Sequence, residues 1–159
     1  MAFIPADEFA ETNIPVGAVA PAEIIRALRY AGDAADTIVV VKLTGAQVLS
    51  AAERSVSRAP QSFDGFLQVS GLQLQSTSSQ PAGQRLSLVG AGGSEISATH
   101  TYRVAMPRAL AEGGLGYFQF WKKKDVEKDT GITLSDSLKT YLAAHPTVPG
   151  KLDGRISIR

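Results

Sequence analysis

The sequence predicts one domain of mixed α and β structure, in the α+β class, and three observations support this. The chain has 159 residues, a length at which folding hides roughly 70% of the unfolded surface in a core. Hydrophobic residues make up 44% of the chain and charged residues 19%, without a low-complexity tract, which indicates a globular protein. Helical and strand patterns are interleaved, but without the strict alternation of a doubly wound sheet.

The first 20 residues contain prolines, an asparagine and a glycine without a sustained hydrophobic period. We therefore expect an irregular lead-in there. Pro21 suits the first turn of a helix, and a short amphipathic helix is expected to follow it, with Gly32 as its stop signal.

Residues 37–43 form a β-branched run that is apolar at nearly every position, which predicts a strand in mid-sheet covered on both faces. Thr44 and Gln47 have the spacing of a capping box, and apolar residues follow at a helical period. The pattern therefore predicts a helix that ends near Ser57.

Residues 67–74 alternate in polarity but change phase at Gly71, which predicts a strand with a bulge at the glycine. Two more strands are expected at residues 85–89 and 101–105, with a turn at the glycines of residues 90–93. Residues 134–142 then carry an apolar stripe at helical period.

That last helix is expected to begin at a cap formed by Thr133 or Ser135 and to stop at Pro146. Residues 155–158 alternate in polarity and predict a final short strand.

Composition excludes several classes of function. A net charge of +1 is too small for nucleic-acid binding, and acidic residues follow the lysines at 122–124, so this cluster is expected to be a solvated surface segment. Without cysteine there are no disulfides, thiolate zinc sites or thiol catalysis. No stretch approaches the roughly 20 apolar residues of a membrane span, and the first residues lack the pattern of a signal peptide.

The sequence supports neither a catalytic group nor a metal or cofactor site. A binuclear metallohydrolase centre needs several His, Asp and Asn ligands, and the two histidines here, His100 and His145, lie outside any metal-ligand spacing. No Gly-x-Ser-x-Gly nucleophile motif occurs. Two glycine-flanked aromatic segments, at residues 65–67 and 113–118, are more interesting, although composition alone favours core packing for their rings.

Segments spread along the chain in a fixed order resemble the C-terminal domain of 5'-nucleotidases, over about residues 13–158. They are VKLTGAQVL (41–49), ERSV (53–56), GFLQVSGL (65–72), PAGQR (81–85), YRVA (102–105), AEGGLGY (111–117), DTGIT (129–133) and LDGRI (152–156). The resemblance implies a layered α/β/β/α domain with mixed sheets at residues 13–159, preceded by a lead-in at residues 1–12 that departs from the family.

The resemblance also implies a binding site. Phe66 and Tyr117 match the family's base-stacking pair, and Gly113, Gly114 and Gly116 form the loop that presents Tyr117. Each stacked base would contribute roughly 1–3 kcal/mol. Two features depart from the family: residues 6–11 lack its Asn-x-Gly-Gly-Ile-Arg motif, and a leucine replaces the aspartate of the glycine loop.

Two functions follow as expectations. The first is a nucleotide- or nucleoside-binding domain of a 5'-nucleotidase-like hydrolase, which lacks the metallophosphoesterase domain with its two metal ions and needs it as a partner for catalysis. The second is a degenerate scaffold or interaction module that has lost nucleotide binding. Leftover apolar surface would favour self-association, and relatives in the family are commonly periplasmic or extracellular.

Overall fold

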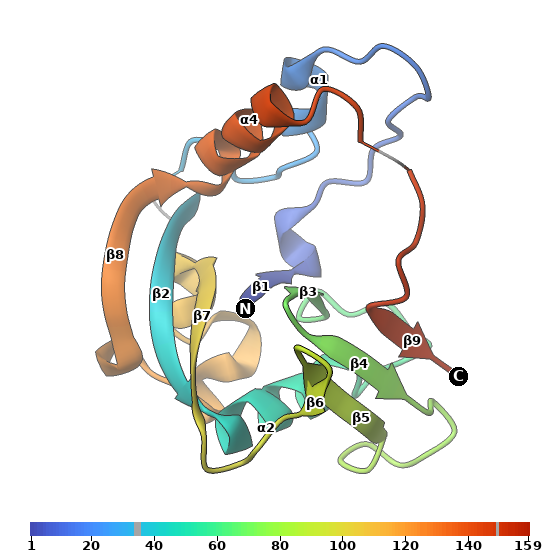
Figure 1. Cartoon of the computed structure of the whole chain (residues 1–159), viewed down its shortest axis with the longest axis vertical. Coiled ribbons are helices and arrows are strands. Elements are labelled where there is room, and N and C mark those ends of the chain that lie inside the picture. The colour runs from blue at the N-terminus through green and yellow to red at the C-terminus, as the bar shows by residue number, and fades with distance from the viewer. Residues whose placement is uncertain (34–35, 149) are drawn as a thin grey trace.

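The computed structural model describes residues 1–33, 36–148 and 150–159, which form two β-sheets with helices packed around them (Figure 1). The five-stranded sheet has the order β3-β1-β7-β2-β8, and the four-stranded sheet has the order β6-β5-β4-β9. The strands are β1 (Ala2–Pro5), β2 (Thr37–Thr44), β3 (Leu67–Ser70), β4 (Gln73–Ser76), β5 (Leu86–Ala91), β6 (Ser94–Glu95), β7 (Thr101–Pro107), β8 (Val126–Thr133) and β9 (Ile156–Ile158).

Both sheets are mixed. β1 pairs with β7, and β4 with β9, in parallel, whereas the other strand pairs are antiparallel. The helices are α1 (Pro21–Ile25), α2 (Gly45–Ser55), α3 (Arg108–Ala111) and α4 (Leu134–Ala144), with 3₁₀ turns at η1 (Ala6–Glu8), η3 (Gly114–Gln119) and η4 (Lys123–Asp125). The predicted class of mixed α and β structure with mixed sheets is confirmed.

The β-branched run forms β2, which lies between β7 and β8 as predicted for a mid-sheet strand. Val39, Val41 and Leu43 are completely buried on one face. The prediction that both faces are covered is wrong, because the opposite face carries the exposed Lys42. β2 pairs antiparallel with both neighbours, and antiparallel strands can leave one face toward solvent in this way.

The helix α2 follows β2 and begins at the predicted capping box. The Gln47 N–H donates to Thr44 Oγ1 at 3.3 Å, and the Thr44 N–H donates to Gln47 Oε1 at 2.8 Å. These bonds satisfy backbone donors that a helix start leaves unpaired. The helix ends at Ser55, two residues before the predicted end, and its Val48 is completely buried against the sheet.

The first segment of the chain differs from the prediction. Residues 2–5 form β1, which lies inside the five-stranded sheet between β3 and β7, instead of an irregular lead-in. Phe3 is completely buried, and its ring centroid lies 6.5 Å from that of Trp121. The strand has four residues and ends in Pro5, so it is too short to show a local pattern. Long-range pairing and the burial of Phe3 therefore stabilise it.

Gly71 also acts differently from the predicted bulge. It has a φ of +67°, and the chain leaves β3 there and enters β4 in the other sheet. Leu72 and Leu74 are both buried beyond this turn. The left-handed conformation, which glycine adopts without strain, moves the chain between sheets and explains the change of phase.

The remaining predicted elements are confirmed as β5, β7, α1, α4 and β9, although α1 ends at Ile25, before the expected stop at Gly32. At α4 the cap is Thr133, whose Oγ1 accepts from the Asp136 N–H at 3.0 Å. The strand β8 was not predicted, because its charged residues resemble a solvated segment; the lysines at 122–124 just before it are indeed exposed.

The main apolar core lies where the five-stranded sheet meets α2 and residues 110–121, and it extends to the four-stranded sheet. We call this region the α2 side. Where η1, α1 and α4 approach one another, which we call the α4 end, three of the buried side chains are Glu8, Asp36 and Ser135.

Candidate functional site

Tyr117 anchors the glycine-rich segment in the core. Its ring is completely buried and stacks on Trp121, with centroids 5.0 Å apart and an interplanar angle of 13°. Its hydroxyl donates to the Gly65 carbonyl at 2.7 Å, and burial raises the pKa of this phenol. In this conformation Tyr117 holds the loop against residue 65 and has no free face for a ligand.

The ring that the glycine loop exposes is the next one, Phe118, at 60% exposure. Gly113, Leu115 and Gly116 have φ values of 97°, 56° and 83°, so the chain turns sharply before it enters the last turn of η3. A Cβ at Gly113 would lie 2.7 Å from the Phe118 Cβ. The glycine loop therefore exposes the ring of residue 118 and not that of residue 117.

Phe66 is half-buried directly before β3, and its carbonyl accepts from the Ala6 N–H at 2.7 Å. The hydrogen bond from the Tyr117 hydroxyl to the Gly65 carbonyl joins the two predicted motifs. Within the part of the chain that the structure describes, the rings paired with Tyr117 are Phe120 and Trp121, not Phe66.

Arg54 of α2 occupies the other face of the Tyr117 ring. Its guanidinium carbon lies 5.4 Å from the Tyr117 centroid and 5.3 Å from the Phe63 centroid, so the planar cation is held between two rings. Its Nη2 donates to the Leu115 carbonyl, whereas its Nε is buried without an acceptor among the described residues. A Cβ at Gly116 would collide with this guanidinium, so the glycine makes room for it.

Sequence reasoning missed Arg54 and Phe63. The only available signals were a basic residue in the last turn of a helix and an aromatic residue two positions before a glycine. A Cβ at Gly65 would lie 2.6 Å from the Phe63 ring, so this glycine too is needed for the stack.

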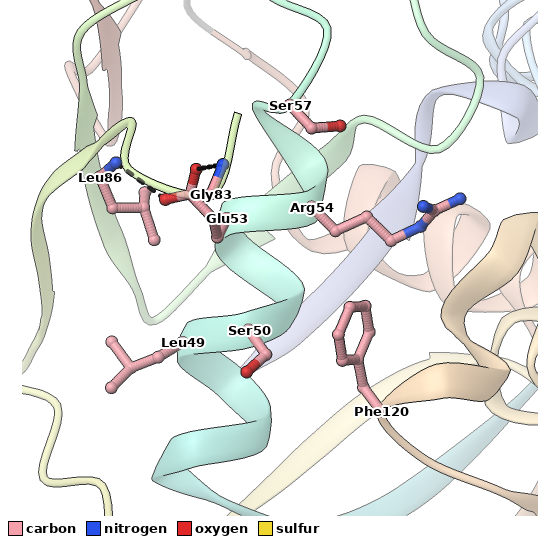
Figure 2. A pocket seen from close by; sticks show the side chains of 8 residues that line it. All are labelled: Leu49, Ser50, Glu53, Arg54, Ser57, Gly83, Leu86 and Phe120. Carbon is pink, nitrogen blue, oxygen red and sulfur yellow. Dashed lines mark hydrogen bonds between the residues drawn. The ribbon is translucent and has the colours of Figure 1, made fainter. Parts of the chain in front are cut away.

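A pocket of about 500 Å³ opens along the exposed side of α2 (Figure 2). Its lining residues are Leu49, Ser50, Glu53, Arg54, Ser57, Gly83, Leu86 and Phe120. The Glu53 carboxylate accepts three backbone N–H bonds of 2.9 Å, from Gly83, Arg85 and Leu86. In Figure 2 it extends toward Gly83 and Leu86, on the opposite side of the helix from Arg54.

A second polar cluster, formed by Glu8, Asp36 and Ser135, lies at the α4 end. Glu8 is only 4% exposed, and burial, reinforced by the charges of Asp36 and Asp7, raises its pKa to about 7. Asp36 accepts from the Ser135 hydroxyl at 3.0 Å. Glu8 Oε2 and Asp36 Oδ1 are buried without a hydrogen-bond partner in the described ranges.

The described residues contain no group of three or more His, Cys, Asp or Glu side chains that could hold a metal ion. His100 packs edge-on against Tyr102 at 4.9 Å, and His145 stacks on Tyr141 at 4.2 Å; both histidines are exposed. In the same ranges, no helix is both long and apolar enough to cross a membrane.

Comparison with known proteins agrees with the fold and the motifs. The profile of the family described as 5'-nucleotidase, C-terminal domain matches residues 1–123. The 5'-nucleotidases of Diplobatis ommata and Homo sapiens are each 29% identical over 128 residues, which cover 76% of this chain and 22% of each relative. The chain thus spans about a fifth of the length of these relatives.

Solved structures show the same relation. The 5'-nucleotidase precursor of Thermus thermophilus has a TM-score of 0.84 at 29% identity, and the match covers 99% of this chain and 31% of that one. The NAD nucleotidase of Haemophilus influenzae has a TM-score of 0.82 at 19% identity, covering 99% and 29%, and this match supports the fold alone.

Proposed function

Because the chain belongs to the 5'-nucleotidase C-terminal domain family, we propose that it is a nucleoside- or nucleotide-binding domain of a 5'-nucleotidase-type hydrolase. The observation that supports a ligand site is the glycine loop, which exposes the Phe118 ring while Tyr117 fixes the loop against Gly65. In this proposal the site is formed by Phe118 together with Phe66, Gly113, Gly114 and Gly116. Tyr117 holds the glycine loop in position.

We propose further that hydrolysis requires a metallophosphoesterase domain or subunit, which would hold the divalent metals. This chain matches between 22% and 31% of the length of its relatives, and its described residues offer no metal-binding group. The role of this domain would then be to hold the base of the substrate while the partner carries out the chemistry.

Calorimetric titration of the purified chain with adenosine and with AMP tests the binding role. Stacking contributes roughly 1–3 kcal/mol per base, so F118A and F66A should each weaken nucleoside affinity about fivefold or more. Y141A, which removes a ring that is 50% exposed on α4, is the matched control and should leave affinity unchanged. Equal affinities in F118A and Y141A would contradict the proposed site.

The need for a partner is tested by phosphate release from AMP in the presence of Mg²⁺ or Mn²⁺. The chain alone should release none, and release should appear when a metallophosphoesterase domain is added. Release by the chain alone that survives stringent purification would show that it contains a catalytic centre of its own.

One observation favours the scaffold role instead. The resemblance implies that residues 6–11 lack the family's Asn-x-Gly-Gly-Ile-Arg motif and that a carboxylate replaces the arginine that would grip an anion; Glu11 in this segment is exposed. The scaffold role predicts a stable fold with no heat of nucleoside binding at millimolar concentration. It also predicts self-association through exposed apolar side chains such as Val16 and Leu152, which sedimentation would detect.

A further inference from the structure

Within the described ranges, Arg54 is a half-buried cation without an acidic partner. The salt bridges of arginines there are formed by Arg29, Arg103, Arg108 and Arg155. Arg54 contacts two ring faces and one carbonyl, and its Nε has no acceptor. Partly desolvated charges in proteins are normally paired, so a negative group is missing from this environment.

The neighbouring acid does not supply that group. Glu53 also lines the pocket, but its carboxylate is already bound by three backbone N–H groups of residues 83–86. These bonds stabilise the charged carboxylate and fix it on the far side of α2, toward Gly83 and Leu86 (Figure 2). Arg54 therefore lines the pocket without a counter-ion from the part of the chain that the structure describes.

The other lining residues suit a small anionic ligand. Ser50 and Ser57 place hydroxyl groups along the same pocket, and the Phe120 ring and two leucines provide apolar walls. The pocket is a shallow hollow that is open to solvent, with a volume of about 500 Å³ that suits a small molecule. Arg54 is also fixed in direction by the rings of Phe63 and Tyr117, so little side-chain freedom would be lost on binding.

We propose that this pocket is an oxyanion site, in which the Arg54 guanidinium pairs with the phosphate or carboxylate group of a small ligand and the Ser50 and Ser57 hydroxyls donate to it. The site lies on α2 and does not depend on nucleoside binding at Phe118. The expected ligand is a small molecule with an oxyanion next to an apolar or aromatic part, and it would bind outside the glycine loop.

The test is titration of the whole chain with inorganic phosphate, with acetate and with AMP, at an ionic strength held constant by chloride, followed by NMR shifts of residues 50–57. R54Q should weaken phosphate binding about tenfold or more, and R54K should have an intermediate effect because it keeps the charge but not the planar fork. R58Q is the matched control: Arg58 also contacts the Phe63 ring, at 5.2 Å, but does not line the pocket. It should change binding less than about twofold.

A second variant keeps Arg54 and guards against loss of folding in R54Q. S50E places a carboxylate four residues before Arg54 on the same helix, where it can act as the missing counter-ion. S50E should abolish phosphate binding and raise the thermal midpoint of the chain. The comparison of phosphate with acetate shows which oxyanion the pocket prefers.

Three outcomes would overturn the proposal. The first is no binding of phosphate or acetate up to about 20 mM, a concentration that would detect even very weak binding. The others are equal losses of affinity in R54Q and R58Q, or unchanged phosphate affinity in S50E. None of them bears on nucleoside binding, because neither phosphate nor acetate contains a base. Failure of the nucleoside titrations would likewise leave this proposal standing.

Discussion

The α2 side and the α4 end of the molecule are stabilised by different physical interactions. On the α2 side, Val48, Tyr117 and Trp121 are buried in the continuous apolar core. At the α4 end, the carboxylates of Glu8 and Asp36 are buried beside Ser135, outside that core. The stability gained by burying apolar groups does not depend on pH, whereas the free energy of burying a carboxylate depends on its protonation. The two regions should therefore respond differently to mutation and to pH.

The largest effect is expected for W121A on the α2 side. This change removes a buried ring that stacks on Tyr117 and the hydrogen bond from Nε1 to the Leu110 carbonyl at 2.8 Å. It should lower the free energy of unfolding by about 3–5 kcal/mol in urea titrations. F118A, three residues earlier but exposed, should cost less than about 0.5 kcal/mol. Similar losses in both variants would contradict the assignment of Tyr117 and Trp121 to the core.

The second effect is a pH dependence at the α4 end. Because the pKa of Glu8 is raised to about 7, its stabilising contribution is fully present below the ordinary value of 4.5 and is lost as pH rises through about 7. Relative to E8Q, the free energy of unfolding should fall by roughly 3 kcal/mol between about pH 4.5 and about pH 7.5.

Glu95, an exposed residue of β6, provides the control for this experiment, and E95Q should leave the pH profile as it is in the parent chain. Parallel curves for the parent and E8Q would mean that Glu8 titrates like a solvated glutamate. The charged neighbours of Glu8 are Asp36, Asp7 and Arg29. These residues are the same in the parent and in E8Q, so the difference between the two pH profiles reports on Glu8.

A smaller effect tests the contact between Arg54 and the glycine loop. G116A places a Cβ against the guanidinium at a residue with a φ of 83°, and it should cost about 1–2 kcal/mol. Gly131 has a similar φ of 66° but open space around it, so G131A should show only the conformational part, about 1 kcal/mol. In an R54Q background the difference between the two should disappear, which a double-mutant cycle in urea would measure.

The smallest effects compare the two helix caps, one in each region. T44A at α2 removes one half of a reciprocal capping box, and T133A at α4 removes a single cap bond to the Asp136 N–H. Each should cost about 1 kcal/mol, with T44A the larger because α2 packs its buried Val48 against the sheet one turn after the cap. Thermal midpoints by circular dichroism would decide the order, and a larger loss in T133A would reverse the comparison.

Elements with strong local signals were predictable from the sequence. β2 has a dense β-branched run, α2 has a capping box, and α4 has an apolar stripe between a cap and a proline. β1 and β8 were not predictable, because four residues ending in Pro5, and a strand rich in charged residues, gain their order from pairing with distant strands. Gly71 showed that a change of phase can mark a move between sheets as well as a bulge.

The site was predictable only as a region. The motifs predict a site shared by the glycine loop and residues 65–66, and the Tyr117 hydroxyl does bond to the Gly65 carbonyl. They could not show which of two adjacent rings points outward, since that depends on the left-handed turn at Leu115 and Gly116. Arg54 carries no motif at all, because its role arises from rings contributed by two other segments.

The position of β1 has a practical consequence for protein engineering. The sequence of residues 1–12 predicts an irregular lead-in, yet the strand β1 in this segment lies between β3 and β7. A shortened chain without residues 1–12 would expose two strand edges with unpaired backbone groups, those of β3 and β7. Any extended peptide could pair with these edges, including a strand from a second copy of the chain. Clipping of this segment by a protease would therefore convert a well-behaved domain into an aggregation template.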